Sequence, residues 1–212
     1  MALNLSEKNV LVAEVVSELR NKHTPPTLFR RYLRMLGTYM AYEVASLLET
    51  EETTVETPLG IAKARKHKDT IIVITVLRAA VPMAEGVIEQ FSTASMGFVS
   101  ASRGKMLEPG GKDFRIDVTY FNVPKLEGNI AIIVDPMLAS ASTLLYILER
   151  VSEQNPKQII ILSAIASTYG IKRIKDRFPD VIIFAGDIDE YLNEKGYIVP
   201  GLGDAGDRAF NT

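Results

Sequence analysis

The strongest constraint on the fold is an apolar run that ends abruptly in a polar turn. Residues 130–134 read Ile-Ala-Ile-Ile-Val, and Asp135 and Pro136 close the run. Small and hydroxyl residues follow at 139–143, and an apolar helical pattern begins at Leu144. A short apolar run bounded by turn residues is typical of a strand buried on both faces, as in parallel sheets. The order of strand, small-residue turn and helix therefore predicts an α/β fold.

The same turn predicts an anion site. The first N–H groups of a helix lack partners within the helix and carry partial positive charge. Bulky side chains would keep a phosphate away from these groups, whereas the Ala, Ser and Thr residues at 139–143 would not. We therefore expect residues 137–143 to hold a phosphate.

The remaining pattern alternates between strands and helices, with Ser6 as the expected cap of the first helix. Helices are expected around apolar positions from Val10 to Leu19 and at 28–48, 83–91, 144–151 and 169–178. Strands are expected at 53–56, 61–65, 71–77, 96–101, 115–123, 158–164 and 181–185. The Gly- and Lys-rich stretch 104–112 joins two strand patterns, which predicts a hairpin arm at 103–123. This arm is either a flap over the site or an inert surface hairpin.

Two of these strands end at an arginine, Arg78 and Arg103. Ligands of open α/β sheets bind beyond the carboxyl ends of the strands, so the arginines favour an anion over a pair of surface salt bridges. Near the other end of the chain, four glycines lie within 196–208 among Tyr197, Ile198 and Leu202. This mixture predicts an ordered loop with a tight backbone path that faces a ligand.

Composition excludes several classes of partner. The chain has 24 Lys and Arg against 26 Asp and Glu, which gives no general attraction to nucleic acid or anionic lipid. It has no Cys, no signal-like start and no apolar run of membrane-spanning length, so we expect a single cytoplasmic domain, 1–212, away from membranes. Asp187, Asp189 and Glu190 suggest a metal site, although an acidic loop is the favoured interpretation.

Five segments together resemble the uracil phosphoribosyltransferase family of type I phosphoribosyltransferases. They are GYIVPGLGDAGDR at 196–208, VDPMLASAST at 134–143, LRAAVPMAEG at 77–86, SASR at 100–103 and FRRYLRMLGTYMAYE at 29–43. The first is the most specific, and the resemblance covers nearly the whole chain. It implies a central, mostly parallel sheet flanked by helices, with N-terminal helices at about 6–48, the hairpin arm and a uracil loop at about 196–208.

The resemblance also implies transfer of the 5-phosphoribosyl group from phosphoribosyl pyrophosphate to uracil, giving UMP and pyrophosphate in pyrimidine salvage. Arg78, Arg103 and Asp204 would be catalytic, and Mg²⁺ would be carried mainly by the substrate, with Asp204 as a possible ligand. Uracil would meet the backbone at Ile198, Gly203, Asp204 and Ala205. The phosphoribosyl pyrophosphate site would comprise Arg78, Arg103, Asp135, Pro136, Met137, Leu138, Ala139, Ser140, Ala141, Ser142, Thr143 and Asp204.

The turn departs from the family pattern, which commonly reads Ala-Thr-Gly-Gly-Ser where this chain reads Ala-Ser-Ala-Ser-Thr. Without the glycine pair the turn must either keep φ negative or accept strain. The hydroxyls of Ser140, Ser142 and Thr143 are expected to compensate as donors. Similarly, residues 80–82 read Ala-Val-Pro in place of a glycine-containing segment.

Regulation and alternatives stay open at the level of sequence. Family members are commonly oligomers, which predicts a dimer or tetramer, and some respond to GTP as activator and CTP as inhibitor. Arg30, Arg31, Tyr32, Leu33 and Arg34 are the candidate GTP residues, although a solvated helix face also explains the arginines. Two alternative functions use the same fold: a nucleotide-responsive RNA-binding regulator and a catalytically weak nucleotide sensor.

Overall fold

A computed structural model describes residues 1–106 and 114–212, and it omits the side chains of residues 102, 103, 105, 106 and 114. The helices are α1 Val10–Arg20, α2 Pro26–Ala45, α3 Val81–Ile88, α4 Ser142–Ser152, α5 Thr168–Arg177 and α6 Ala205–Phe210. The strands are β1 Ala2–Asn4, β2 Thr50–Thr57, β3 Gly60–His67, β4 Ile71–Leu77, β5 Ser95–Met106, β6 Phe114–Asn122, β7 Ile130–Val134, β8 Met137–Leu138, β9 Gln158–Ser167, β10 Ile182–Asp189, β11 Tyr191–Leu192 and β12 Ile198–Val199.

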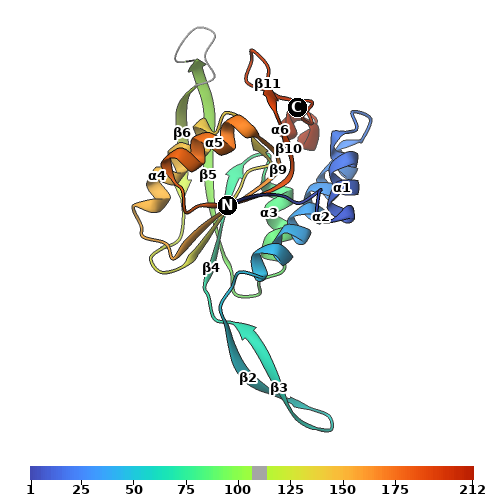
Figure 1. The fold of residues 1–212 in the computed structure, drawn as a ribbon, viewed down its shortest axis with the longest axis vertical. Helices are drawn as coiled ribbons and strands as arrows, with labels where there is room; N and C mark the ends of the chain where they lie inside the picture. Colours follow the sequence, from blue (N-terminus) through green and yellow to red (C-terminus); the bar gives the residue numbers. More distant parts are fainter. Residues whose placement is uncertain (107–113) are drawn as a thin grey trace.

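A mostly parallel sheet forms the centre of the molecule (Figure 1). Its strands run in the order β1-β10-β9-β7-β4-β5-β6, and only the pairing of β5 with β6 at one edge is antiparallel. Strand β7 occupies residues 130–134, as the sequence predicts, and all five residues are buried. Because β4 and β9 flank it with the same direction, the carboxyl ends of these strands share one edge of the sheet. The predicted α/β fold is confirmed.

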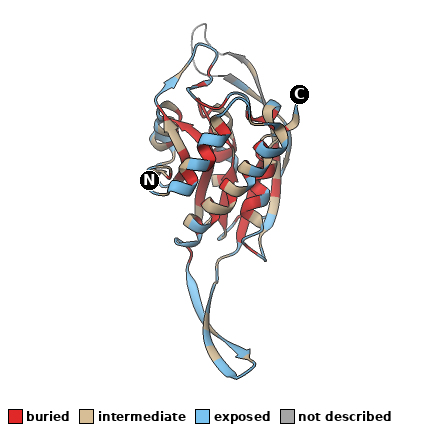
Figure 2. Ribbon diagram, turned by 90° about the vertical axis from the view of Figure 1, so that its right-hand side faces the viewer, coloured by how far each residue is buried: buried red, intermediate tan, exposed pale blue. Residues whose placement is uncertain are grey.

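Helices cover both faces of the sheet. Helices α1, α2 and α3 pack together on one face, whereas α4 and α5 lie on the other (Figure 1). Buried residues concentrate in the sheet and on the inner helix faces (Figure 2). In α2 these inward residues include Phe29, Leu36, Met40 and Val44, four of the positions that the helical pattern predicts.

The N-terminal boundary predictions are partly wrong. Asn9, not Ser6, caps α1 by accepting a hydrogen bond from Leu11 N–H, and the Ser6 hydroxyl donates instead to the Gly186 carbonyl. Val10 lies at the exposed start of the helix. The second predicted helix ends three residues early, so Leu47 is exposed. The hydrophobic period continues past the helix end, which is why pattern alone overextends it.

Two hairpins leave the body of the fold. The β2–β3 hairpin is antiparallel and projects away from the sheet, with no buried residue along either strand (Figures 1 and 2). The predicted arm at 103–123 is an antiparallel pair, but residues 104–106 continue β5 instead of starting a loop. The remainder of the predicted loop, 107–112, lies outside the described residues. Among the described helices, none has the length and apolarity needed to cross a membrane.

Candidate active site

A cavity of about 340 Å³ opens at the carboxyl edge of the sheet. It lies where β4 and β7 end, and the C-terminal loop completes its wall. Its lining residues are Val76, Leu77, Ala79, Ala101, Asp135, Met137, Ala139, Thr143, Gly196, Tyr197, Ile198, Gly203, Asp204, Ala205 and Gly206. The volume falls within the range of small-molecule sites, and the location is the one where α/β sheets bind ligands.

The predicted phosphate turn forms one wall of this cavity. Asp135 leaves the end of β7, and its Oδ1 accepts a hydrogen bond of 3.2 Å from the Met137 N–H. Ala141, at the N-cap of α4, has φ 65° and ψ 5°, and no side chain that the structure describes caps the helix. The first N–H groups of α4 are therefore available for a ligand. In place of the missing glycine pair, Ala141 itself adopts the left-handed conformation, so the backbone of this turn is strained.

Strand β9 and helix α5 hold the turn from behind. The Ser167 hydroxyl donates to the Ala139 carbonyl at 2.6 Å and accepts from Gly170 N–H at 2.8 Å. Arg173 donates to the Ser140 carbonyl at 2.6 Å. A Cβ on Gly170 would stand 2.2 Å from the Ala139 oxygen, so only glycine allows this approach. These contacts fix the turn through its carbonyl groups and use none of the N–H groups at the start of α4.

The side chains of the turn divide between the cavity and the interior. Asp135, Met137, Ala139 and Thr143 line the cavity. Leu138 and Ser140 are fully buried, and Pro136 is buried as well. The Ser140 hydroxyl lies 3.0 Å from that of Ser142. The Ser140 side chain packs inward and does not line the cavity, so the expected contact between its hydroxyl and a ligand stays a prediction.

Of the two predicted arginines, the structure describes the side chain of Arg78 but not that of Arg103. Leu77 and Ala79 line the cavity, while the Arg78 guanidinium between them donates to Thr212 Oγ1 at 3.0 Å and lies 3.3 Å from Asp207 Oδ1. The Arg78 side chain is 57% exposed, so this contact is a weak one that a stronger anion can replace. Arg103 belongs to β5, but its side chain lies outside the described residues.

The C-terminal loop closes the cavity opposite the phosphate turn. Gly201 and Gly203 have φ of 57° and 81°, which confirms the predicted tight backbone path. Ile198 and Ala205 are buried, whereas Gly203 and Asp204 are exposed. Asp204 also caps α6 by accepting from Asp207 N–H at 2.9 Å. The loop thus presents backbone groups and one carboxylate to the cavity.

Comparison with known proteins identifies this arrangement. The family model for uracil phosphoribosyltransferase matches residues 6–212. The chain belongs to the uracil phosphoribosyltransferase family. The uracil phosphoribosyltransferase of Thermococcus gammatolerans is 46% identical over 96% of this chain and 91% of its own length. That of Metallosphaera sedula is 45% identical over 99% of this chain and all of its own.

Solved structures agree with the family fold. The AQ2163 protein from Aquifex aeolicus superposes with a TM-score of 0.91 at 34% identity, over 99% of this chain and 98% of its own. A hypoxanthine phosphoribosyltransferase from Staphylococcus aureus has a TM-score of 0.52 at 11% identity, over 77% of this chain and 76% of its own. The latter likeness concerns the fold alone and confirms the type I phosphoribosyltransferase architecture.

Tyr197 is one of several cavity-lining residues of this family member that the sequence analysis did not assign to the site. Tyr197 lines the cavity and is 43% exposed. It stands beside Ile198 within the glycine-rich segment, but the sequence pattern offered it only as evidence that the loop is ordered. An aromatic residue between loop glycines was the available signal, since an exposed ring there has few other packing partners.

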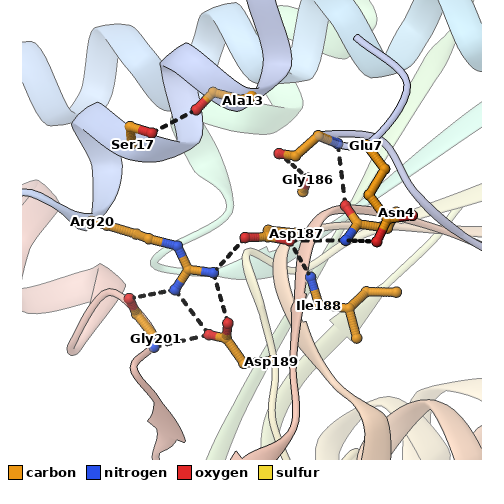
Figure 3. Close-up of polar contacts among 11 residues, drawn as sticks. Asn4, Glu7, Ala13, Ser17, Arg20, Gly186, Asp187, Ile188, Asp189 and Gly201 are labelled. Atoms are coloured by element: carbon orange, nitrogen blue, oxygen red, sulfur yellow. Dashed lines mark hydrogen bonds and ion pairs between the residues drawn. The ribbon is translucent and has the colours of Figure 1, made fainter. Parts of the chain in front are cut away.

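Two of the three acidic residues predicted to form a loop belong instead to a strand, and only Glu190 lies beyond its end. Asp187 and Asp189 lie within β10, and both pair with Arg20 of α1 at 2.8 Å (Figure 3). Burial alone would raise the pKa of Asp187, but hydrogen bonds from Arg20 and Asn4 lower it overall. Among the described residues no three His, Cys, Asp or Glu side chains cluster as metal ligands would. The acidic-loop interpretation is replaced by a structural ion-pair network.

The candidate effector residues of α2 are not all on one surface. Arg31 is exposed, and Arg34 forms an exposed ion pair with Glu89. Arg30 donates to the Ala209 carbonyl of α6 at 2.6 Å. Leu33 is fully buried in the core, so its side chain is not at the surface where an effector would bind. Tyr32 is partly buried.

Proposed function

We propose that this chain transfers the 5-phosphoribosyl group from phosphoribosyl pyrophosphate to uracil, forming UMP and pyrophosphate. The observation that carries the proposal is one cavity bounded by both a phosphate-binding type of turn and the family's C-terminal loop. The relatives from Thermococcus gammatolerans and Metallosphaera sedula are named for this activity. A phosphate and a planar base bound at these two walls would place the reacting carbon between them.

The phosphate wall supplies the sugar-phosphate contacts in this proposal. Backbone N–H groups at the start of α4 and the Thr143 hydroxyl would bind the 5′-phosphate. The Asp135 carboxylate, which lines the cavity at the end of β7, would accept hydrogen bonds from the ribose hydroxyls. Arg78 and Arg103 would bind the pyrophosphate and offset the negative charge that develops as it leaves.

The C-terminal wall would recognise uracil through backbone groups of Ile198, Gly203, Asp204 and Ala205. Uracil has a carbonyl at O4 and an N3–H, whereas cytosine reverses the donor and acceptor character of both groups. A rigid backbone donor and acceptor would therefore be left unpaired by cytosine, at about 1–3 kcal/mol for each buried group. Discrimination of this kind requires a loop that cannot turn its peptide groups around.

Magnesium fits the donor set of the cavity as a companion of the substrate. Asp135 and Asp204 both line the cavity, and carboxylate oxygens suit this hard cation. In our proposal Mg²⁺ is held mainly by pyrophosphate oxygens and water, with Asp204 as the nearest protein carboxylate. Bound in this way, the ion would supply charge neutralisation for the leaving group. Positioning and charge stabilisation then provide most of the rate without a dedicated general base.

Regulation by GTP and CTP and assembly into a dimer or tetramer are further proposals. Arg30 joins α2 to α6, so a ligand on this helix face would be mechanically connected to the C-terminal segment. The projecting β2–β3 hairpin exposes Val55, Leu59 and Ile61, which favours burial against another chain. GTP titration of the reaction rate and light scattering of the purified protein test these two proposals.

The central test is formation of UMP and pyrophosphate from uracil, phosphoribosyl pyrophosphate and Mg²⁺. Asp135→Asn should lower kcat/KM for phosphoribosyl pyrophosphate at least tenfold, since it removes a charged acceptor. The matched control Asp176→Asn alters a carboxylate of an exposed i,i+4 pair with Lys172 on α5 and should be neutral. Binding of UMP without turnover would favour the sensor, and salt-dependent RNA binding the regulator.

A further inference from the structure

The C-terminal loop at 196–208, proposed to face the base, is held by an arginine that does not line the cavity. Arg208 of α6 reaches back and donates through Nη1 to the Leu202 carbonyl at 2.8 Å. The same guanidinium donates to the Leu19 and Asn21 carbonyls at the end of α1, with 2.6 Å for Asn21. Its carbon atom Cζ stands 4.3 Å from the centre of the Phe29 ring. Arg208 therefore joins the loop to the corner between α1 and α2.

The Leu202 carbonyl matters because it shares a peptide unit with the N–H of Gly203. In a planar trans peptide the C=O and the following N–H point in opposite directions. An arginine that binds this oxygen from the protein side thus directs the Gly203 N–H away from itself. Gly203 lines the cavity, so the outward direction is the one that a ligand would meet.

Glycine at 203 leaves the direction of this peptide to external contacts. Its φ of 81° is accessible to glycine at little cost, and glycine also tolerates many other conformations. The peptide could therefore turn unless something holds it. The aliphatic stem of Arg208 also lies close to this residue, with Cδ 3.6 Å from the position of a Cβ on Gly203.

The preceding peptide groups are fixed as well. Arg20 donates to the Gly201 carbonyl at 2.9 Å, and Asp189 accepts from the Gly201 N–H at 2.9 Å (Figure 3). Asp189 is 7% exposed and is itself paired with Arg20, so neither group is free to move. A Cβ on Gly201 would stand 2.2 Å from the Ile198 oxygen, which closes the loop on itself.

We propose that Arg208 is a positioning residue that aims the Gly203 N–H at an exocyclic oxygen of the base, with the Arg20–Asp189 pair holding the adjoining peptide. The inference rests on the proposed function, because it assigns Gly203 to uracil. Guanidinium binding also polarises the peptide, so its N–H becomes a better donor. Arg208 thereby acts on base affinity and base choice without touching the substrate.

The test compares Arg208→Met and Arg208→Lys with the wild-type protein in steady-state UMP synthesis. Methionine keeps an unbranched apolar side chain and removes every donor together with the charge over Phe29, whereas lysine can still donate to one carbonyl. Arg177→Met is the matched control, since Arg177 pairs with Glu149 on the surface, away from the cavity. Thermal unfolding of each variant establishes that the comparison uses folded protein.

We expect Arg208→Met to raise KM for uracil roughly 3- to 10-fold, the value of one well-oriented hydrogen bond, and to leave KM for phosphoribosyl pyrophosphate within about twofold. Arg208→Lys should recover part of the loss. 2-Thiouracil and 4-thiouracil each carry sulfur, a poorer acceptor than oxygen, at one of the two exocyclic positions. For the analogue whose sulfur meets the Gly203 N–H, that hydrogen bond is already weak, so Arg208→Met should raise KM less than it does for uracil.

Equal increases in both KM values, or a fall in kcat with KM for uracil unchanged, would overturn the positioning role while leaving the activity intact. A penalty that is identical for uracil and both thio analogues would also overturn it. Should Arg208→Met fail to fold, Arg208→Lys and Arg20→Lys carry the same KM comparison. Absence of UMP with the wild-type protein, in contrast, would refute the proposed function itself.

Discussion

Replacing Ala141 with glycine tests the idea that the phosphate turn stores backbone strain. Ala141 has φ 65° at the N-cap of α4, in the left-handed region that disfavours a Cβ. Uracil phosphoribosyltransferases commonly carry glycine at the equivalent position, so Ala141→Gly restores a residue that adopts this conformation freely. Ala139→Gly is the matched control, since Ala139 belongs to the same turn, is 4% exposed like the 5% exposed Ala141, and has no positive φ.

The magnitudes predict opposite outcomes for the two substitutions. Each removes a buried methyl group, worth about 0.8 kcal/mol, and each adds a glycine entropy cost of roughly 0.5–1 kcal/mol. Ala139→Gly should therefore lower the free energy of unfolding by about 1.5 kcal/mol. At Ala141 the relief of left-handed strain returns roughly 1–2 kcal/mol, so the net change should be close to zero.

Urea unfolding followed by circular dichroism measures this difference. For a chain of this size the expected gap of about 1.5 kcal/mol corresponds to roughly 3–6 °C in Tm. The reasoning is refuted if both variants lose the same free energy, because Ala141 would then carry no strain. UMP synthesis by Ala141→Gly should stay at or above the wild-type rate, since the helix N–H groups keep their places.

Three further predictions concern residues around the site. Thr75→Val should raise the free energy of unfolding by roughly 1 kcal/mol in urea, because the Thr75 hydroxyl is buried without a hydrogen-bond partner among the described residues; a loss of stability would show that it has one. Gly170→Ala should destabilise the fold by about 1–3 kcal/mol and raise KM for phosphoribosyl pyrophosphate, because its Cβ would collide with the Ala139 oxygen. The lowered pKa of Asp187 contributes stability that is present above the unfolded value of about 3.9 and is lost as pH falls toward the folded value. Asp187→Asn should therefore flatten the drop in urea midpoint between pH 5 and pH 3, and an unchanged slope would contradict this.

The sheet was predictable where burial alone decides the local structure. Strand β4 and strand β7 begin and end as the apolar runs do, because each is buried between parallel neighbours. Boundaries governed by single hydrogen bonds were not predictable. Asn9 and Ser6 are both good helix caps, and only the contact of Ser6 with Gly186, 180 residues away, decides between them.

The sequence predicted which segments form the site but not which way their side chains point. The residues of the phosphate turn and of the C-terminal loop do share one cavity, as the placement of strand ends suggests. Which way each side chain points depends on packing from distant elements, as with Ser140 beneath α5. The contacts of Arg20 with Gly201, and of Arg208 with the end of α1, join segments far apart in the sequence, which no local pattern encodes.

The meeting of α1 with α6 has a consequence for how the protein is made. Strand β1 pairs with β10, and Arg208 reaches the end of α1, so these segments wait for partners that are synthesised more than 150 residues later. Parallel pairing over such separations is slow, because long chain segments must be ordered before these contacts form. A nascent chain that ended before α6 could bury much of the sheet while its base-facing loop still lacked an anchor. Substrate recognition would thus be among the last properties acquired during biosynthesis, which delays activity until the whole domain has folded.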